Sequence, residues 1–137
     1  MKQLHMSEQY GGADFDDVHD HGPTTAAEAL SRFDAKVWTV EVQAAEANEG
    51  CSPTLSLTRA DEGRVFWVSP FLDGAKLRFV NDYVRPLENP GLFSRLIRRT
   101  HTSTTSRDLS PTEARHALEL FAQRKYSDLV ALISEKD

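Results

Sequence analysis

The sequence predicts a small α+β domain, in which an antiparallel meander of about four strands is flanked by an N-terminal helix and one or two C-terminal helices. Helix-capping signals occur near residues 25 and 110, and short apolar segments separated by turn signals lie between them. A length of 137 residues with 39% hydrophobic residues suits a single compact core. We assign residues 1–22 to a loose acidic arm and residues 23–137 to the single domain.

The N-terminal arm is rich in Gly, Asp and His and has no sustained period of 2 or 3.6 residues. The first regular element is therefore expected to be a helix over residues 25–34. Thr25 is suited to the N-cap, and Glu28 lies three residues on, where its side chain completes a capping box. Leu30 and Phe33 share one face of this helix.

Alternating residues predict the strands of the meander. In residues 37–42 the pattern places Trp38, Val40 and Val42 on a buried strand face. Residues 55–58 and 65–68 are expected to pair as antiparallel strands around a turn at residues 60–63, and Pro70 is expected to end the second of them. A fourth strand is predicted over residues 76–80, after a turn at residues 73–74.

Four aromatic residues of these segments are interpreted as core, with stacking against a ligand as the alternative. They are Trp38, Phe66, Trp67 and Phe79.

The C-terminal third begins with a loop predicted over residues 86–91. Residues 92–97 fit a short helix or a strand equally well, and the Thr/Ser-rich residues 100–106 favour an extended or loop conformation. Ser110, Pro111 and Glu113 have the order of an N-cap, a first helical residue and a capping-box partner. We expect a helix there and a second short helix after Lys125.

Charge and composition narrow the function classes. The net charge is −5, made up of −8 in residues 1–62 and +3 in residues 63–137. An acidic chain without a dense basic stripe is a poor candidate for direct nucleic-acid binding and suits a basic protein partner better.

Apolar runs are far shorter than the roughly 20 residues of a membrane-spanning helix, and no secretory signal is apparent. We therefore expect no membrane association and a cytoplasmic location. The single cysteine, Cys51, offers no internal disulfide.

The acidic segment at residues 14–21 is the first candidate site. Its Asp and His side chains are metal-ligand types, but their spacing matches neither a calcium loop nor a helical zinc motif, so we predict no metal site and no cofactor. The remaining readings are a solvated arm and a contact surface for a partner. The carboxylates proposed for that contact are Asp14, Asp16, Asp17, Asp20, Glu46 and Glu49.

An arginine cluster is the second candidate site. Arg95, Arg98 and Arg99 could hold a phosphate or carboxylate through forked hydrogen bonds, or pair with the acidic half of the same chain. No nucleophile elbow or phosphate loop occurs in the sequence, and we expect no catalytic activity.

The arrangement of elements resembles that of the immunity proteins of bacterial polymorphic and contact-dependent toxin systems. Residues 23–33, 55–68 and 110–121 carry the likeness, which covers 37 of 137 residues. The resemblance implies a cytoplasmic protein that binds a cognate toxin domain and blocks its active site without chemistry of its own. The first alternative is a small-molecule-binding or enzymatic α+β domain with an anion site near the arginine cluster. A structural or adaptor protein of a secretion system or phage is the second.

Overall fold

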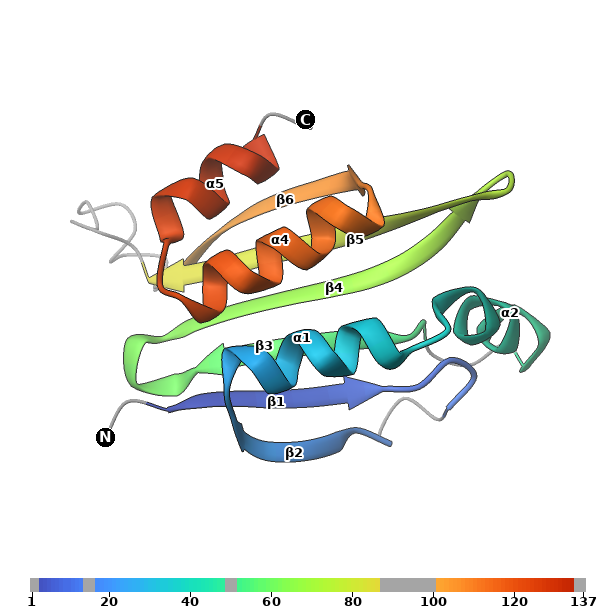
Figure 1. The fold of residues 1–137 in the computed structure, drawn as a ribbon, viewed down its shortest axis with the longest axis horizontal. Coiled ribbons are helices and arrows are strands. Elements are labelled where there is room, and N and C mark those ends of the chain that lie inside the picture. The colour runs from blue at the N-terminus through green and yellow to red at the C-terminus, as the bar shows by residue number, and fades with distance from the viewer. Residues whose placement is uncertain (1–2, 14–16, 49–51, 87–100, 135–137) are drawn as a thin grey trace, which may run out of the picture.

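A six-stranded antiparallel sheet is the centre of the molecule, and helices lie against one of its faces (Figure 1). The computed structural model describes residues 3–13, 17–48, 52–86 and 101–134. The predicted α+β class is confirmed, and the sheet has more strands than expected. The described elements are β1 (Leu4–Gln9), β2 (His19–Thr24), α1 (Ala26–Ala35), α2 (Trp38–Asn48), β3 (Thr54–Arg59), the 3-10 turn η1 (Ala60–Glu62), β4 (Arg64–Asp73), β5 (Lys76–Pro86), β6 (His101–Leu109), α4 (Pro111–Ala122) and α5 (Tyr126–Ser134).

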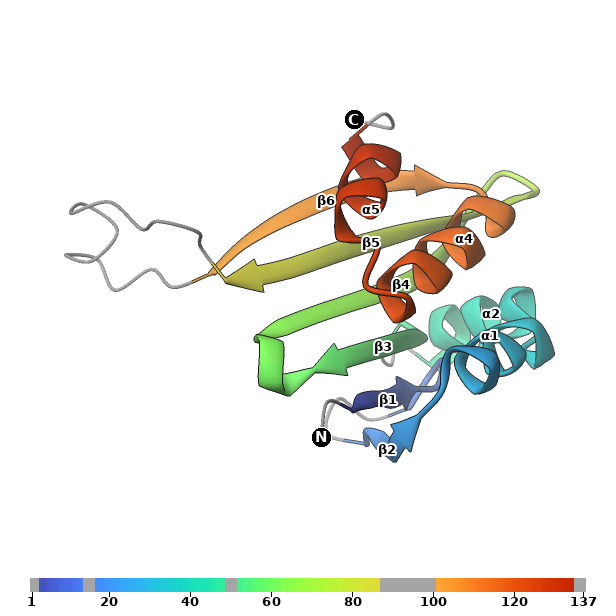
Figure 2. The same ribbon diagram turned by 60° about the vertical axis from the view of Figure 1, so that its left-hand side comes forward.

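The strands lie in the order β2-β1-β3-β4-β5-β6, and every neighbouring pair is antiparallel. β3 to β6 form a consecutive meander. The β1–β2 hairpin joins it because β1 also pairs with β3, after a crossover through α1 and α2. α1, α4 and α5 lie on the same face of the sheet, and α2 lies beyond one of its ends (Figure 2).

The expectation of a loose N-terminal arm is wrong for the described part of residues 1–22. β1 lies inside the sheet, with Leu4, Met6 and Glu8 buried, and β2 forms one edge. The alternation of residues 4–8 is a strand signal, but the charged Glu8 occupies one of the buried positions. A charge at that position hides the period, since period-2 patterns are recognised by apolar residues.

The strand expected over residues 37–42 is also wrong, because residues 38–42 form the start of the helix α2. Trp38 and Val42 are buried, whereas Val40 is 56% exposed. Residues 38 and 42 are separated by four positions, so they share a face in a helix as well as in a strand. The alanines at positions 44, 45 and 47, which are strong helix formers, extend the helix beyond the end of the expected strand as far as Asn48.

The other three predicted strands of the meander, at residues 55–58, 65–68 and 76–80, are present with their turns and are longer than expected. Gly63 and Gly74 close the two turns in the left-handed region, with φ of 66° and 62°. Pro70 does not end β4 but pairs with Phe79 of β5. The pairing of β4 with β3 stops at Val68, so the missing N–H of Pro70 lies where β4 has a partner on one side only.

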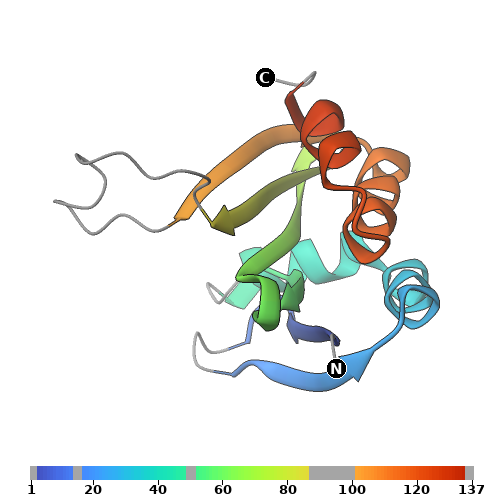
Figure 3. The ribbon, with the colours of Figure 1, turned by 90° about the vertical axis from the view of Figure 1, so that its left-hand side faces the viewer.

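The two faces of the sheet differ in what covers them (Figure 3). Phe66 and Val68 of β4 point into the core beneath the helices, as do Phe79 and Tyr83 of β5. The core prediction is thus correct for Trp38, Phe66 and Phe79. It is wrong for Trp67, which alternation places on the opposite face, where no helix of the described residues covers it, and which is partly exposed.

A polar network fastens α4 and α5 to the β3–β4 turn. Arg59 is buried and donates a 2.6 Å hydrogen bond to the carbonyl of Ala122 at the end of α4. Glu62 accepts hydrogen bonds from Arg124 and Tyr126 at 2.8 and 2.9 Å. Burial opposes ionisation of Glu62, but these donors outweigh it and lower the pKa of the carboxyl.

Both predicted caps begin helices, although only one forms the full capping box. The Ser110 hydroxyl accepts from the Glu113 amide at 3.2 Å, and the Glu113 carboxylate accepts from the Ser110 amide at 3.0 Å. At the first helix, Thr25 accepts from the Glu28 amide at 3.2 Å, but the Glu28 carboxylate accepts from the Thr24 hydroxyl instead.

Replacing the N-cap of α4 tests how much its capping box stabilises the fold. Ser110→Ala removes an acceptor for a helix amide and should lower the free energy of unfolding by about 1 kcal/mol in urea denaturation. Ser31→Ala, at an exposed position inside α1, is the control and should be neutral or slightly stabilising. Equal midpoints for both variants would contradict the assigned role of Ser110.

Candidate functional site

The structure describes three of the six carboxylates predicted to contact a partner. Asp17, Asp20 and Glu46 are exposed. Residues 14, 16 and 49 lie outside the described residues. The alternative anion site at residues 95, 98 and 99 also lies outside them.

The three described carboxylates lie at one end of the sheet. Asp17 and Asp20 flank the start of β2, Glu46 is in α2, and Figure 1 places both segments at the same end. The large hydrophobic side chains that are exposed among the described residues also belong to these segments: Val18 (52%), Val37 (63%) and Val40 (56%). We call this surface the acidic end and define it by the residues Asp17, Val18, Asp20, Val37, Val40 and Glu46.

Gly11, which follows β1, packs directly on α2. The Gly11 amide donates to the Glu41 side chain at 3.2 Å, and a Cβ at position 11 would lie 1.8 Å from the Glu41 carbonyl oxygen, so only glycine fits there. The Lys36 ammonium lies 4.0 Å from the centre of the Tyr10 ring, which meets the His19 ring at 4.7 Å. Residues 10 and 11 therefore link the start of β2 to Lys36 and α2.

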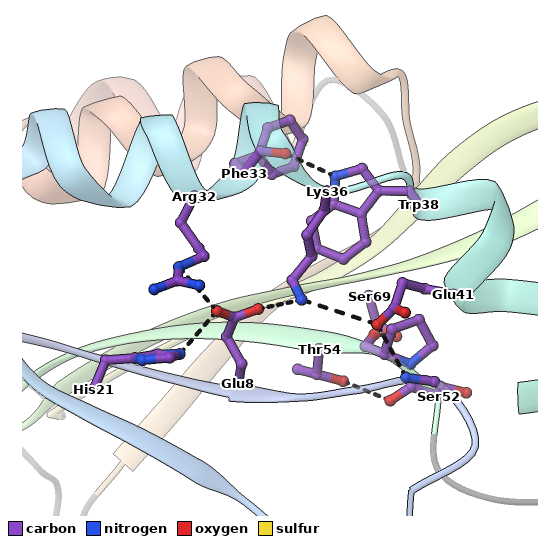
Figure 4. A network of polar contacts seen from close by, with 12 residues as sticks. Glu8, His21, Arg32, Phe33, Lys36, Trp38, Glu41, Ser52, Thr54 and Ser69 are labelled. Atoms are coloured by element: carbon purple, nitrogen blue, oxygen red, sulfur yellow. Dashed lines mark hydrogen bonds and ion pairs between the residues drawn. The ribbon is translucent and has the colours of Figure 1, made fainter. Parts of the chain in front are cut away.

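A buried carboxylate beneath this end holds its parts together (Figure 4). The Glu8 side chain is fully buried and faces α1. His21 Nε2 lies 2.8 Å and Arg32 Nε 3.3 Å from Glu8 Oε1, while the Lys36 ammonium contacts Oε2. Lys36 also lies 3.9 Å from Glu41 of α2. One carboxylate thus joins β1 to β2, to α1 and, through Lys36, to α2.

A β-bulge in β2 directs His21 toward Glu8. The pairing of β1 with β2 shifts between Met6, opposite Gly22, and Ser7, opposite Asp20, so that His21 is the extra residue. Gly22 takes a left-handed φ of 71°, and its amide donates to Asp20 at 2.8 Å. Sequence reasoning gave His21 no role, because nothing in the sequence indicates which strand it faces.

The Glu8 network is suited to positioning rather than to catalysis. A hollow of about 470 Å³ beside it is lined by His21 and Arg32 together with Thr24, Glu28 and Ser31. The carboxylate itself is covered, however, and both His21 and Arg32 are directed at it. Within the described residues, no three His, Cys, Asp or Glu side chains are arranged to hold a metal ion.

The face of the sheet that no helix of the described residues covers, called here the uncovered face, carries a second polar arrangement. Trp67 of β4 lies opposite Asp82 of β5, and a hollow of about 450 Å³ beside Trp67 is lined mainly by hydroxyl and apolar side chains. Burial raises the pKa of Asp82, an effect that a hydrogen bond from Ser103 only partly offsets. One oxygen of Asp82 is covered and has no hydrogen-bond partner among the described residues.

Comparison of the chain with protein-family models, with curated proteins and with solved structures found no match. Within the part of the chain that the structure describes, no helix has the length and apolar character needed to cross a membrane.

Neutralising Glu8 tests its positioning role. Glu8→Gln keeps the shape of the side chain but leaves the nearly buried Lys36 ammonium without its closest counter-charge, so the free energy of unfolding should fall by about 3 kcal/mol. Asp34→Asn, which alters the exposed ion pair with Arg115, should have a much smaller effect. Urea unfolding of both variants measures the difference. Similar losses in the free energy of unfolding would show that the buried Glu8 stabilises the fold no more than an exposed ion pair does.

The raised pKa of Asp82 predicts a specific pH dependence. A carboxyl that is harder to ionise in the folded than in the unfolded state reduces stability above its folded pKa, and this penalty disappears below its unfolded pKa. Asp82→Asn should therefore be more stable than the wild type at pH ~7, with the gap narrowing toward pH ~4. Urea titrations measure this difference in the free energy of unfolding between the variant and the wild type. A difference that widens on acidification would contradict the assignment of Asp82 to a buried environment that raises its pKa.

Proposed function

We propose that this chain is a toxin-neutralising immunity protein that acts in the cytoplasm and binds a basic toxin domain through its acidic end. The observation that carries the proposal is the exposure of carboxylates and valines in the two segments of this end: Asp17, Val18 and Asp20 at the start of β2, and Val37, Val40 and Glu46 at and within α2. Apolar side chains surrounded by charge are a usual composition for a protein interface.

The packing of this end supports the proposal. The Gly11 amide donates to Glu41 of α2, and Lys36 lies between Glu41 and the buried Glu8. A preorganised surface loses little conformational entropy on binding, which favours the tight association needed to neutralise a toxin. The resemblance to immunity proteins carried by residues 23–33, 55–68 and 110–121 supplies the class of partner.

Charge complementarity explains why the partner should be basic. Carboxylates on the acidic end attract a positively charged domain over about a Debye length, roughly 8 Å at physiological salt, and so speed its association. In a nuclease toxin, the same carboxylates would take the place of substrate phosphates in a basic active site.

The test begins with the partner. Tagged protein is used to capture its partner from the native host, the partner is identified by mass spectrometry, and its purified domain is assayed for toxicity. Binding is then measured by surface plasmon resonance for Asp17→Lys/Asp20→Lys, Glu46→Lys and Val40→Asp. We expect slower association for the lysine variants and faster dissociation for Val40→Asp.

Asp128→Lys is the matched control, because Asp128 is an exposed carboxylate of α5, remote in the fold from α2. It should bind as the wild type does, and added salt should slow association of the wild type. A captured partner without toxicity would refute the immunity role. A toxic partner whose binding is unchanged by all the acidic-end substitutions would refute the location of the interface.

A further inference from the structure

We propose that the uncovered sheet face binds a neutral oligosaccharide, with Trp67 as the stacking platform. The inference does not depend on the immunity role, since it concerns a face of the sheet rather than the acidic end.

The register of the sheet places a polar row across five strands. Ser7 pairs with Ser56, Ser56 with Trp67, Trp67 with Asp82, and Asp82 with Thr105. Directly opposed residues project from the same face, so these side chains form one line. With strands about 4.8 Å apart, the row extends roughly 19 Å, which suits a chain of linked sugar rings better than a single ring.

The hollow beside Trp67 has the chemistry of a sugar site. Its volume of about 450 Å³ falls within the range of small-ligand pockets. The apolar C–H face of a pyranose packs against an indole ring, and its hydroxyls need donors and acceptors around that ring. The lining is uncharged and consists of Ser52, Thr54, Ser56, Trp67, Ser69, Pro70, Phe71 and Val80.

Asp82 places a partly exposed carboxylate directly opposite Trp67. Its unpartnered oxygen is covered, so only the remaining exposed part of the carboxylate can accept a hydrogen bond from a sugar hydroxyl. Trp67 itself makes no side-chain hydrogen bond among the described residues, in contrast to Trp38, whose indole N–H donates to the Phe33 carbonyl at 3.1 Å.

The same chemistry disfavours single-stranded nucleic acid, which would also stack on an exposed tryptophan. The row contains a carboxylate and no lysine or arginine, so phosphate groups would meet repulsion. Arg78, further along this face, is paired with Asp108 at 2.7 Å.

The experiment screens the purified 137-residue chain against an array of neutral oligosaccharides and then titrates the best one at millimolar concentrations by calorimetry, which does not depend on tryptophan as the reporter. We expect a dissociation constant at least about tenfold higher for Trp67→Ala than for the wild type. Ser56→Phe fills the hollow while keeping Trp67 and should also abolish binding. It serves as the second variant if Trp67→Ala does not fold.

Two substitutions are matched controls. Val65→Ala lies on the same strand and face but outside the hollow, and Asp17→Lys alters only the acidic end, so both should bind the sugar as the wild type does. The proposal is overturned if no oligosaccharide binds, or if binding survives both Trp67→Ala and Ser56→Phe. Two other outcomes would also overturn it, in each case when oligosaccharides do not bind. One is binding of poly-uridine that depends on Trp67, and the other is self-association that depends on Trp67 and is detected by sedimentation.

Discussion

Burial of the Glu8 carboxylate is the constraint on which the N-terminal half of the molecule depends. A charge on the helix-covered face of a sheet is tolerated only when counter-charges accompany it, because an isolated buried ion is costly to desolvate. Here the counter-charges come from three other segments: His21 of β2, Arg32 of α1 and Lys36 at the junction with α2. The ion cluster therefore requires these segments to assemble together, and the position of the acidic end follows from it.

The parts of the fold that the sequence predicted correctly are those in which local signals and tertiary contacts agree. The Ser110 capping box, the turns at Gly63 and Gly74 and the alternation of residues 65–68 each indicate one structure at short range. The expectation failed where a short window fits two periods. Residues 37–42 alternate like a strand, yet Trp38 and Val42 are also one helical turn apart, and only packing against the core selects the helix.

The candidate sites were less predictable, because a side chain's role depends on what lies across from it. Composition alone identified Asp17, Asp20 and Glu46 as exposed acidic residues. It did not identify Glu8, whose partners are at least 13 positions away in the chain. Trp67 was assigned to the core on hydrophobicity, although the alternation that buries Phe66 and Val68 already places it on the other face. The cross-strand row around it exists only through the register of five strands.

The two proposed surfaces meet at the edge strand. Asp20 of the acidic end pairs with Ser7, the first member of the polar row, and both line a hollow of about 400 Å³ with Val18. A protein seated on the acidic end would cover Asp20 and so shorten the row available to a saccharide. If both sites are occupied in the cell, each ligand must then weaken the other by the same factor, because the coupling free energy between two sites is reciprocal. The β-bulge at His21 controls this junction, since it sets both the contact with Glu8 in the core and the pairing of Asp20 with Ser7 on the open face.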